Sequence, residues 1–323
     1  MINIPVVDVI IPIYNRKQYV SRLVRMLEAQ KLKDFCAIFV DDGSTDGTYE
    51  ELVDQLKTAT YQYKLLRQKN GGPSKARNTG IKAAESKWIT FADSDDILTP
   101  EFLAYLYAAV SDGQAEMGYC HLTKVPEGNQ VPLTSVGELS VQTHTAAEAM
   151  KNHYTDWIAP FCLILNKKWL TEAQLLFDEK CRYCEDLIFI TEAIAAAEHV
   201  REIHNCLYVY LPHSGSALRC DDVEKYWNGM EGFDRLEEKL SDCDTDAAKV
   251  FFEMGRARYL LATLRRAALQ MQRKRFVRFA RKLEYKNSRS QMRHLPWKWQ
   301  IAGGMFLVSP NLFYFCVRML FSD

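Results

Sequence analysis

The first hundred residues alternate between short apolar runs and amphipathic stretches. Val6–Ile13 is a continuous run, rich in β-branched residues, and is typical of a strand that is buried on both faces. The apolar positions that follow it recur at helical spacing, at Val20, Leu23, Val24 and Leu27. The pattern therefore predicts a strand followed by a helix.

This unit recurs along the chain. Phe35–Val40 is a second apolar run, and Tyr63–Leu66 and Trp88–Ala92 are two further strand candidates. A second helical stripe consists of Tyr49, Leu52, Val53 and Leu56. Apolar strands that alternate with helices predict an α/β fold, with a mostly parallel central sheet and helices on both faces. Sheets of this kind bind ligands at the carboxyl ends of their strands.

The pattern changes in the second half of the chain. Residues 123–145 are polar and contain prolines, mixed segments follow as far as Tyr210, and helical stripes dominate beyond Asp221. We therefore expect an α/β body over residues 1–218 and a helical C-terminal region over residues 219–323.

The two parts also differ in charge. The whole chain carries 41 basic and 41 acidic residues, yet residues 254–323 hold 15 Lys/Arg against only Glu284 and Asp323, a net charge of +13. Such an asymmetry indicates that the basic end meets something anionic, either nucleic acid or a membrane surface.

Composition narrows the class of protein. With 48% hydrophobic and 25% charged residues, the chain has the balance of a globular protein and is not a disordered one. The N-terminus lacks a signal-peptide pattern, so we expect a cytoplasmic protein with reduced thiols, in which Cys181 and Cys184 pack rather than bind zinc. Residues 301–321 are the most apolar stretch, but Pro310 and Arg318 interrupt it, and we expect no transmembrane helix.

Acidic and small residues collect where the predicted strands end. Asp41–Ser44 (DDGS) follows the second strand and Asp93–Asp96 (DSDD) follows the fourth, so both should face one crevice. Each run is also typical of a turn with a helix N-cap. Three carboxylates within four residues repel one another unless a cation neutralises them, and oxygen ligands favour Mg²⁺ or Mn²⁺. The glycine-rich loops of dinucleotide-binding and P-loop proteins are missing.

Four motifs occur in this region in a fixed order. They are Val9–Asn15 (VIIPIYN), Val40–Gly47 (VDDGSTDG), Asn70–Asn78 (NGGPSKARN) and Phe91–Asp96 (FADSDD). In sequence, order and spacing they resemble the family 2 glycosyltransferases of the GT-A fold, and the resemblance covers about residues 6–215. It implies a GT-A (Rossmann-like) catalytic domain over residues 1–218, with a nucleotide-sugar half at about 1–97 and an acceptor half at about 98–218.

The resemblance implies a nucleotide-sugar site. Its residues would be Pro12, Tyr14, Asp41, Asp42, Asn70, Gly71, Arg77, Asp93 and Ser94. Asp42, or alternatively Asp41, would accept a hydrogen bond from the base, and Asp93 would face the ribose. Arg77 would approach the base or the phosphates, although an arginine at this place is also typical of a solvated helix residue.

The resemblance also implies the metal and catalytic residues. Asp95 would bind Mn²⁺ or Mg²⁺, with Asp96 assisting it or the ribose contact, and His213 is a further candidate for metal or phosphate. Asp186 would be the general base that takes the proton of the acceptor hydroxyl, with Glu185 as the next candidate. Acidic residues in the first turn of a helix also simply favour the helix dipole.

The resemblance thus implies a metal-dependent, inverting glycosyltransferase that uses a nucleotide-sugar donor, with UDP-sugars as the expected class. The acceptor would be a glycan or lipid-linked hydroxyl in polysaccharide biosynthesis. A sugar-nucleotidyltransferase is one alternative, but its glycine-rich loop after the first strand is missing. A nucleic-acid-binding protein is the other, and the acidic body argues against nucleic acid as a partner.

The basic end is expected to dock on an anionic membrane surface at the inner face of the cell membrane without spanning it. The aromatic and apolar residues expected at the headgroup boundary are Trp297, Trp299, Phe306, Leu307, Phe313, Tyr314 and Phe315. The alternative is a helical subdomain that packs these side chains against the catalytic body.

Overall fold

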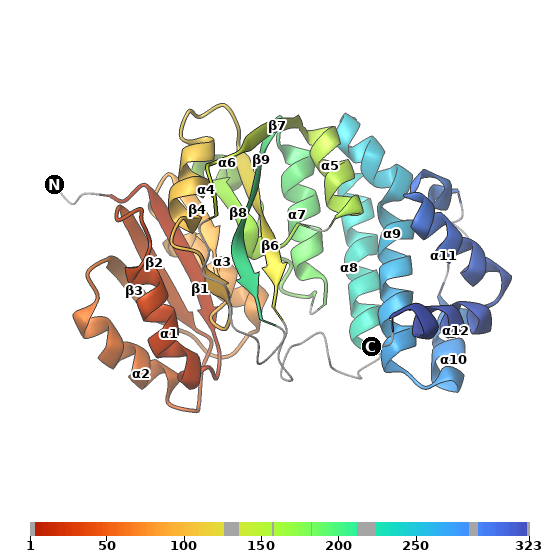
Figure 1. Cartoon of the computed structure of the whole chain (residues 1–323), viewed down its shortest axis with the longest axis horizontal. Coiled ribbons are helices and arrows are strands. Elements are labelled where there is room, and N and C mark those ends of the chain that lie inside the picture. Colours follow the sequence, from red (N-terminus) through yellow and green to blue (C-terminus); the bar gives the residue numbers. More distant parts are fainter. Residues whose placement is uncertain are drawn as a thin grey trace. The chain divides into compact units, whose positions relative to one another are not determined.

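The computed structural model describes residues 4–125, 136–156, 158–181, 183–211, 224–283 and 290–321. The chain forms two compact units (Figure 1). Unit 1 comprises Met1–Ala146 and Ile158–His213, and unit 2 comprises Ala147–Trp157 and Ser214–Asp323. The sequence pattern did not indicate that residues 147–157 join the C-terminal helices, and the predicted boundary at residue 218 lies outside the described residues.

Unit 1 contains the strands and the helices that cover them. Its strands are β1 (Val7–Ile13), β2 (Phe35–Asp41), β3 (Gln62–Arg67), β4 (Trp88–Phe91), β5 (Ile97–Leu98), β6 (Met117–Lys124), β7 (Val141–Thr145), β8 (Leu163–Asn166) and β9 (His199–Tyr210). Its helices are α1 (Lys17–Glu28), α2 (Thr48–Gln55), α3 (Pro73–Ala83), α4 (Phe102–Val110), α6 (Lys167–Glu172) and α7 (Glu185–Ala196), with short 3-10 turns at Leu56–Thr58 and Pro160–Cys162.

The described strands form one mixed sheet in the order β3-β2-β1-β4-β8-β6-β9-β5, and β7 pairs with β9. Strands β1 to β4 are parallel, and β9 is parallel to β6. Strand β8 runs antiparallel between β4 and β6. The prediction of an α/β fold with a mostly parallel sheet is confirmed, and the carboxyl ends of β1, β2 and β4 lie at the same edge.

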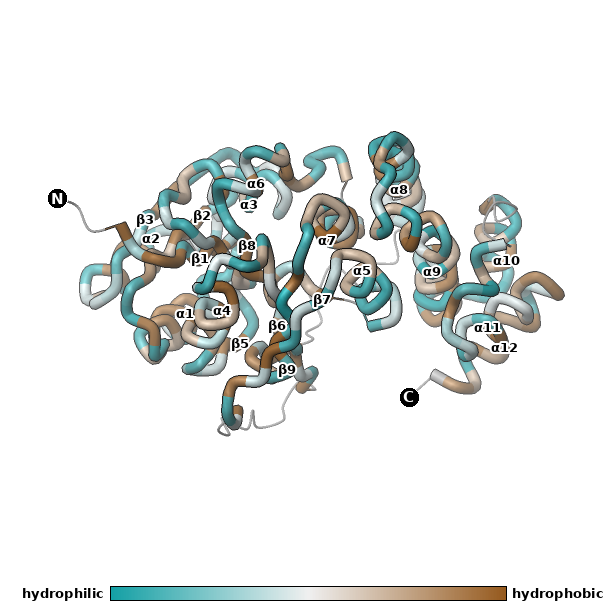
Figure 2. Tube along the Cα trace, turned by 90° about the horizontal axis from the view of Figure 1, so that it is seen from above, coloured by the Kyte–Doolittle hydropathy of each residue, from teal (hydrophilic) through white to brown (hydrophobic). Residues whose placement is uncertain are grey.

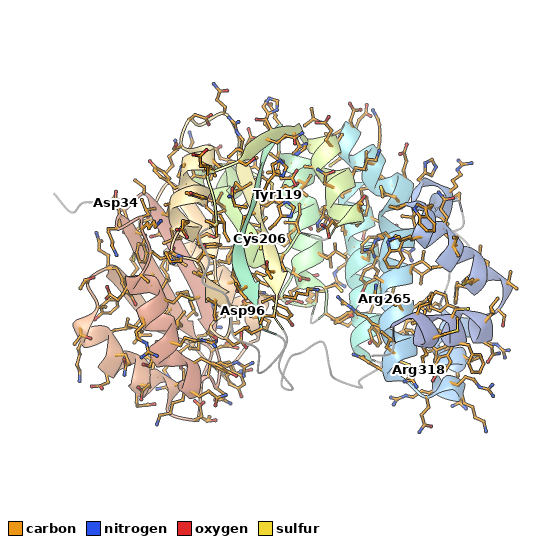
Figure 3. The ribbon with its side chains drawn as sticks, in the orientation of Figure 1. Asp34, Asp96, Tyr119, Cys206, Arg265 and Arg318 are labelled. Atoms are coloured by element: carbon orange, nitrogen blue, oxygen red, sulfur yellow. The ribbon has the colours of Figure 1, made fainter. Side chains whose placement is uncertain are left out.

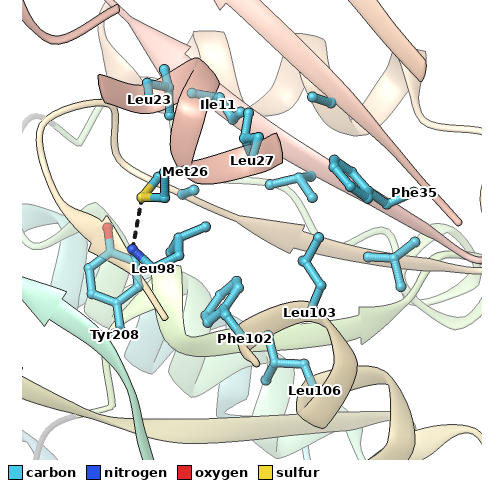
Figure 4. Packing of buried hydrophobic residues seen from close by; sticks show 14 of the residues in the cluster. Ile11, Leu23, Met26, Leu27, Phe35, Leu98, Phe102, Leu103, Leu106 and Tyr208 are labelled. Atoms are coloured by element: carbon cyan, nitrogen blue, oxygen red, sulfur yellow. Dashed lines mark hydrogen bonds between the residues drawn. The ribbon is translucent and has the colours of Figure 1, made fainter. Parts of the chain in front are cut away.

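Helices cover both faces of the sheet because the strands are apolar on both sides. On one face, α3 approaches β1 so closely that a Cβ at Gly80 would lie 2.3 Å from the Ile10 side chain. On the other face, the predicted stripe of α1 packs with α4 in a large buried cluster (Figure 4). There the Leu98 amide donates to the Met26 sulfur at 2.9 Å. Tyr208 of β9 belongs to this cluster, so its ring ties the strand ends to the core.

Unit 2 is helical. Its elements are α5 (Ala146–Thr155), α8 (Glu224–Leu240), α9 (Asp246–Gln270), α10 (Arg273–Lys282), α11 (Trp297–Val308) and α12 (Pro310–Phe321), with a 3-10 turn at Gln291–His294. Thr245 caps α9 by accepting from the Ala248 amide at 3.2 Å. Stacked rings of Phe233 and Tyr259, 4.9 Å apart, join α8 to α9. The long central helix α9 is therefore the buried axis of this unit.

The C-terminal aromatic residues fall into two groups. Phe306, Phe313 and Tyr314 are buried inside unit 2, and the guanidinium of Arg258 lies 3.8 Å from the centre of the Trp299 ring. Trp297 and Phe315 are exposed. The sequence prediction that all of these side chains lie at a membrane surface was therefore wrong for the buried ones, because they form the unit's own core.

Two other expectations can be compared with the fold. No helix among the described residues is long and apolar enough to cross a membrane. The described cysteines carry free thiols, and Cys181 is buried with its sulfur 3.0 Å from the Tyr183 carbonyl oxygen. The packing expected of Cys181 is confirmed.

Candidate active site

The carboxylate of Asp42 organises the first acidic strand end. Its Oδ1 accepts from the Gly71 amide at 2.9 Å and from Gln68 Nε2 at 2.7 Å, and its Oδ2 accepts from the Gly72 amide at 2.7 Å. Gly43 has φ of +76°, and a Cβ there would lie 2.9 Å from the Asn70 amide nitrogen. The loop after β2 and the Asn70 turn are thus one interlocked structure.

Asp41 is fully buried beside it. Its Oδ1 accepts from the Ser44 amide at 3.3 Å, and its Oδ2 lies 3.1 Å from Arg67 Nε. A carboxylate offers about four acceptor positions. At Asp42, three of these positions accept from Gln68, Gly71 and Gly72, so one acceptor position of the Asp42 carboxylate remains for a ligand.

The loop after β1 is tied to the same structure. The Asn15 amide donates to Ser44 Oγ at 2.9 Å, and the Thr45 amide donates to Asn15 Oδ1 at 2.8 Å. These bonds hold Asn15 at a positive φ of 51° and leave the neighbouring Tyr14 side chain 46% exposed. Pro12 is the last residue but one of strand β1, just before this loop, and Asn70 and Gly71 are exposed on the adjoining turn. The predicted nucleoside residues are therefore gathered by three connected loops.

The second acidic strand end follows β4, where Asp96 is held by β9. Asp96 Oδ2 accepts from the Tyr208 hydroxyl at 2.9 Å, and its Oδ1 accepts from the Leu211 amide at 2.9 Å. Burial, with the nearby charge of Asp93, raises the pKa of Asp96 to about 8. The Tyr208 hydroxyl also accepts from the Asp93 amide at 3.2 Å. Both Asp96 oxygens are thus bound by the protein's own donors (Figure 3 marks the residue).

Asp95 lies between Asp93 and Asp96 in the sequence, and its carboxylate faces the start of α1. Its Oδ2 is 3.0 Å from Arg16 Nε, and its side chain is 17% exposed. Arg22 donates to its main-chain carbonyl oxygen. Ser94 is buried beside it. Arg16 was not among the sequence-predicted residues, although its place directly after the Asn15 motif was the available signal.

Arg77 joins the two halves of the site. Its side chain is 7% exposed, its Nη2 lies 3.1 Å from Asp93 Oδ1, and its Nη1 lies 3.5 Å from Glu185 Oε1. Its guanidinium carbon is 5.3 Å from the centre of the Phe177 ring. Among the described residues, its Nε has no hydrogen-bond partner. The interpretation of Arg77 as a solvated helix residue was wrong, because the side chain is buried among carboxylates.

Two acidic residues begin α7. Burial, together with the charge of Asp186, raises the pKa of Glu185 to about 7, while Arg77 opposes the rise. Asp186 Oδ1 accepts from the Leu187 amide at 2.8 Å, which is an ordinary contact within the first turn. Asp186 also adds to the field that raises the pKa of the Arg77 guanidinium, although burial opposes it. The predicted catalytic pair therefore lies at the Arg77 cluster.

The sequence did not assign roles to the residues that support this cluster. Asn78 donates to the Phe177 carbonyl oxygen at 2.9 Å and accepts from the Phe177 amide at 2.9 Å. This exchange fixes the ring that lies against Arg77. Asn78 was visible as the last residue of the third motif, whereas no sequence motif includes Phe177.

His213, the further candidate for metal or phosphate binding, lies outside the described residues.

The chain is similar to known proteins. Residues 8–171 match the family described as glycosyl transferase family 2. The glycosyltransferase EpsJ of Bacillus subtilis, itself uncharacterised, is 31% identical over 217 residues, which cover 66% of this chain and 63% of EpsJ. The chain thus spans slightly less than two thirds of that relative.

Two solved structures have a similar fold. Staphylococcus aureus TarS (residues 1–349) in complex with UDP-GlcNAc superposes with a TM-score of 0.64 at 23% identity, covering 89% of this chain and 78% of that one. The Pyrobaculum calidifontis mannosyltransferase PcManGT, in complex with GDP-Man and Mn²⁺, gives 0.56 at 16% identity, covering 100% and 89%. TarS is described as a poly(ribitol-phosphate) β-N-acetylglucosaminyltransferase.

Proposed function

The chain belongs to glycosyl transferase family 2, and from that membership we propose that it transfers a sugar from a UDP-sugar to a hydroxyl of a glycan or lipid-linked acceptor, with inversion at the anomeric carbon. The family decides between glycosyl transfer and the nucleotidyl transfer considered from the sequence. TarS, which shares the fold and was solved in complex with UDP-GlcNAc, supports a UDP-sugar donor, and its description as a poly(ribitol-phosphate) β-N-acetylglucosaminyltransferase supports a polymeric acceptor.

One observation carries the proposal. Arg77 connects Asp93, at the end of β4, to Glu185, at the start of α7. It thus joins the expected donor half to the expected acceptor half through a buried cluster of charge. Such a cluster at the carboxyl ends of parallel strands suits a reaction in which a charged donor meets a hydroxyl nucleophile.

The donor set at the end of β4 fits a hard divalent cation. Asp93 and Asp95 are crowded carboxylates, and burial raises the pKa of Asp93 in spite of its contact with Arg77. We assign Asp95 as the metal ligand and Asp96 as the residue that positions this loop against Tyr208. When bound, Mn²⁺ or Mg²⁺ would offset the negative charge of the departing diphosphate.

The protein's own residues then orient the reactants. Tyr14 offers an exposed ring for stacking on the base, and the Asn70–Gly72 turn brings backbone close to the nucleotide. Arg77 holds Asp93 and Glu185 in place. Asp186 takes the proton of the acceptor hydroxyl. The oxygen of that hydroxyl forms a bond to the anomeric carbon, while the bond from that carbon to the diphosphate breaks.

Asp186 suits the role of base better than Glu185. Glu185 Oε1 lies 3.5 Å from Arg77 Nη1, so the Glu185 carboxylate is engaged with that cation. The described contact of Asp186 involves only Oδ1, so Oδ2 is the oxygen assigned to the proton transfer.

The test is to measure donor binding and transfer separately. Asp186→Asn keeps the shape of the side chain but cannot accept a proton, so UDP affinity should be unchanged while the transfer rate falls by about 10²–10⁴-fold. Asp178→Asn, in the loop before α7, is the control and should retain activity. A panel of nucleotide sugars with MnCl₂, read by melting temperature, identifies the donor. Undiminished transfer by Asp186→Asn would move the base elsewhere.

We also propose that unit 2 docks on an anionic membrane surface, where a lipid-linked acceptor would be presented. The apolar character of α11 and α12 is visible in Figure 2. Their strongly exposed apolar side chains are Trp297, Ile301, Val308, Leu312, Phe315, Met319 and Leu320. Arg273 lies 5.7 Å from the Phe315 ring, and Lys298 lies 5.8 Å from the Trp297 ring. Apolar side chains beside cations suit an interface with anionic lipid.

Liposome flotation tests the docking. Wild-type protein should float with vesicles containing phosphatidylserine, stay behind with neutral ones, and detach at high salt. Val308→Ser combined with Met319→Ser should weaken flotation, whereas Val53→Ser, at an exposed position in unit 1, should not. Flotation that is equal for both variants, or absent for the wild type, would contradict the proposal.

A further inference from the structure

Three histidines surround one glutamate in unit 1. Glu202 Oε1 lies 2.8 Å from His121 Nε2 and 3.8 Å from His204 Nδ1, and its Oε2 lies 2.6 Å from His144 Nε2. The rings of His121 and His204 are stacked, with their centres 6.1 Å apart. Nothing in the proposed glycosyl transfer uses this cluster.

The cluster is built by three neighbouring strands. His121 comes from β6, His144 from β7, and Glu202 and His204 from β9. The β6–β9 pairing is irregular here, because Cys120 pairs with Ile203 while His121 pairs with Cys206. A bulge of this kind redirects side chains, and it lies where these imidazoles converge on one carboxylate.

The cluster is separate from the donor site. Glu202 and Tyr208 are six residues apart on β9, which corresponds to roughly 20 Å of extended strand. Figure 3 labels Tyr119, the β6 residue that pairs with Glu202, and Asp96, the partner of Tyr208, at different levels of the sheet. A ligand at Glu202 would therefore not be the donor or its metal.

We propose that His121, His204 and Glu202 form a binding site for a divalent transition-metal ion of the Zn²⁺ class. Their ligand atoms all lie within 4.8 Å of one another. Two imidazoles and one carboxylate are a donor set that suits zinc, whereas Mg²⁺ and Mn²⁺ prefer oxygen ligands such as those of Asp95. The His204 side chain is 44% exposed and leaves a path from solvent and a position for water.

His144 has a different part in this site. Its side chain is 8% exposed, and its Nε2 holds the Glu202 oxygen that faces away from the other two histidines. A hydrogen bond of this kind orients a ligating carboxylate, and the loss of such a partner typically costs about 10–100-fold in metal affinity. A bound ion would join β6 to β9 at the bulge, so it would stabilise the folded state of unit 1.

The experiment is a calorimetric titration of the full chain with ZnCl₂, without nucleotide, after chelator treatment and dialysis. We expect one Zn²⁺ per chain and a rise in melting temperature. His204→Ala should weaken binding by more than His144→Ala does, and both by at least about tenfold. His199→Ala, an exposed histidine on the same strand, is the matched control and should bind as the wild type does. Asp95→Ala should also retain the site.

The outcomes separate this site from the donor site. MgCl₂ should give no heat that depends on His204, and Zn²⁺ binding should survive in Asp95→Ala even though that variant loses metal-dependent UDP binding. Equal Zn²⁺ affinity in the wild type and His204→Ala would overturn the proposal, as would the absence of binding by a wild-type protein with a normal melting temperature. The His204 side chain is 44% exposed, so its replacement is not expected to unfold the chain.

Discussion

At the end of β2, the oxygens of Asp41 and Asp42 are held by backbone amides, Gln68 and Arg67. At the end of β4, Asp93, Asp95 and Asp96 also have protein partners, but their carboxylates lie close enough to one another to raise the pKa of Asp93 and of Asp96. Burial is the main cause of the raised pKa values of Asp93 and Asp96, and the negative charge of a neighbouring carboxylate raises each of them further. The first cluster thus stabilises two loops, and the second holds charge that a cation would relieve. Two similar acidic runs therefore have opposite energetic roles.

The largest difference should be seen in folding stability. Asp42→Ala removes the acceptor for the Gly71 and Gly72 amides and for Gln68, and we expect a loss of about 3 kcal/mol. Urea unfolding of the full chain, followed by far-ultraviolet circular dichroism, measures this loss. The control is Asp54→Ala, since Asp54 is 71% exposed and should change stability by less than about 0.5 kcal/mol. If Asp42→Ala lost as little stability as Asp54→Ala, water would be replacing the Asp42 carboxylate as the acceptor for these donors.

The pH dependence at Glu185 should be smaller, because its titration is shared with Asp186 and Arg77. Its pKa rises from 4.5 to about 7 on folding, so the folded state keeps a proton that the unfolded state loses. Wild-type stability should therefore fall as the pH rises from about 4.5 to 7. The advantage of Glu185→Gln over the wild type should grow across that window and level off above it.

Urea unfolding at several pH values between 5 and 8 measures this difference. Glu172→Gln, at a position 65% exposed on α6, is the control and should give a constant difference. A constant difference for Glu185→Gln as well would mean that Glu185 is already ionised throughout, and the Arg77 cluster would then resemble the end of β2.

One part of this site could be predicted from the sequence and another part could not. The strand ends and their acidic residues could be predicted, because apolar runs and the motifs after them are local patterns. The partners could not, since Asp96 and Tyr208, or Arg77 and Glu185, are more than a hundred residues apart. Which carboxylate is satisfied and which is crowded depends on those distant contacts.

In the helical region, too, local sequence patterns predicted the elements but not their tertiary contacts. Its helices followed from their periodicity, but periodicity does not show which apolar side chains face a neighbouring helix. Phe313 and Phe315 are both aromatic and two residues apart, and only Phe315 is exposed. The sequence also gave no sign that α5 belongs with unit 2, because a helix in the middle of the chain carries no mark of its tertiary partners.

Asp95→Ala should affect binding but not folding. Its removal lessens repulsion with Asp93 and Asp96 but also breaks the contact with Arg16, so stability should change by less than about 0.5 kcal/mol. The increase in UDP affinity that MnCl₂ produces should fall at least about tenfold. Calorimetric titrations of UDP with and without MnCl₂ measure it, and Asp244→Ala, at a position 93% exposed, is the control. Retained metal dependence would place the ion elsewhere.

The smallest expected effect is a gain. Arg16 Nε lies 3.0 Å from Asp95 Oδ2, and a cation at Asp95 would have to displace it. An ion pair at this partly exposed position is worth about 0.2–1 kcal/mol, so Arg16→Ala should raise the affinity for MnCl₂ alone by about 1.4-fold to fivefold. Arg25→Ala, at an exposed position on α1, the helix that follows Arg16, should leave that affinity unchanged. If Arg16→Ala instead weakened Mn²⁺ binding, the guanidinium would be positioning Asp95 rather than competing for it, and the contact with Arg16 would support the loop after β4 as the contacts of Asp42 support the loop after β2.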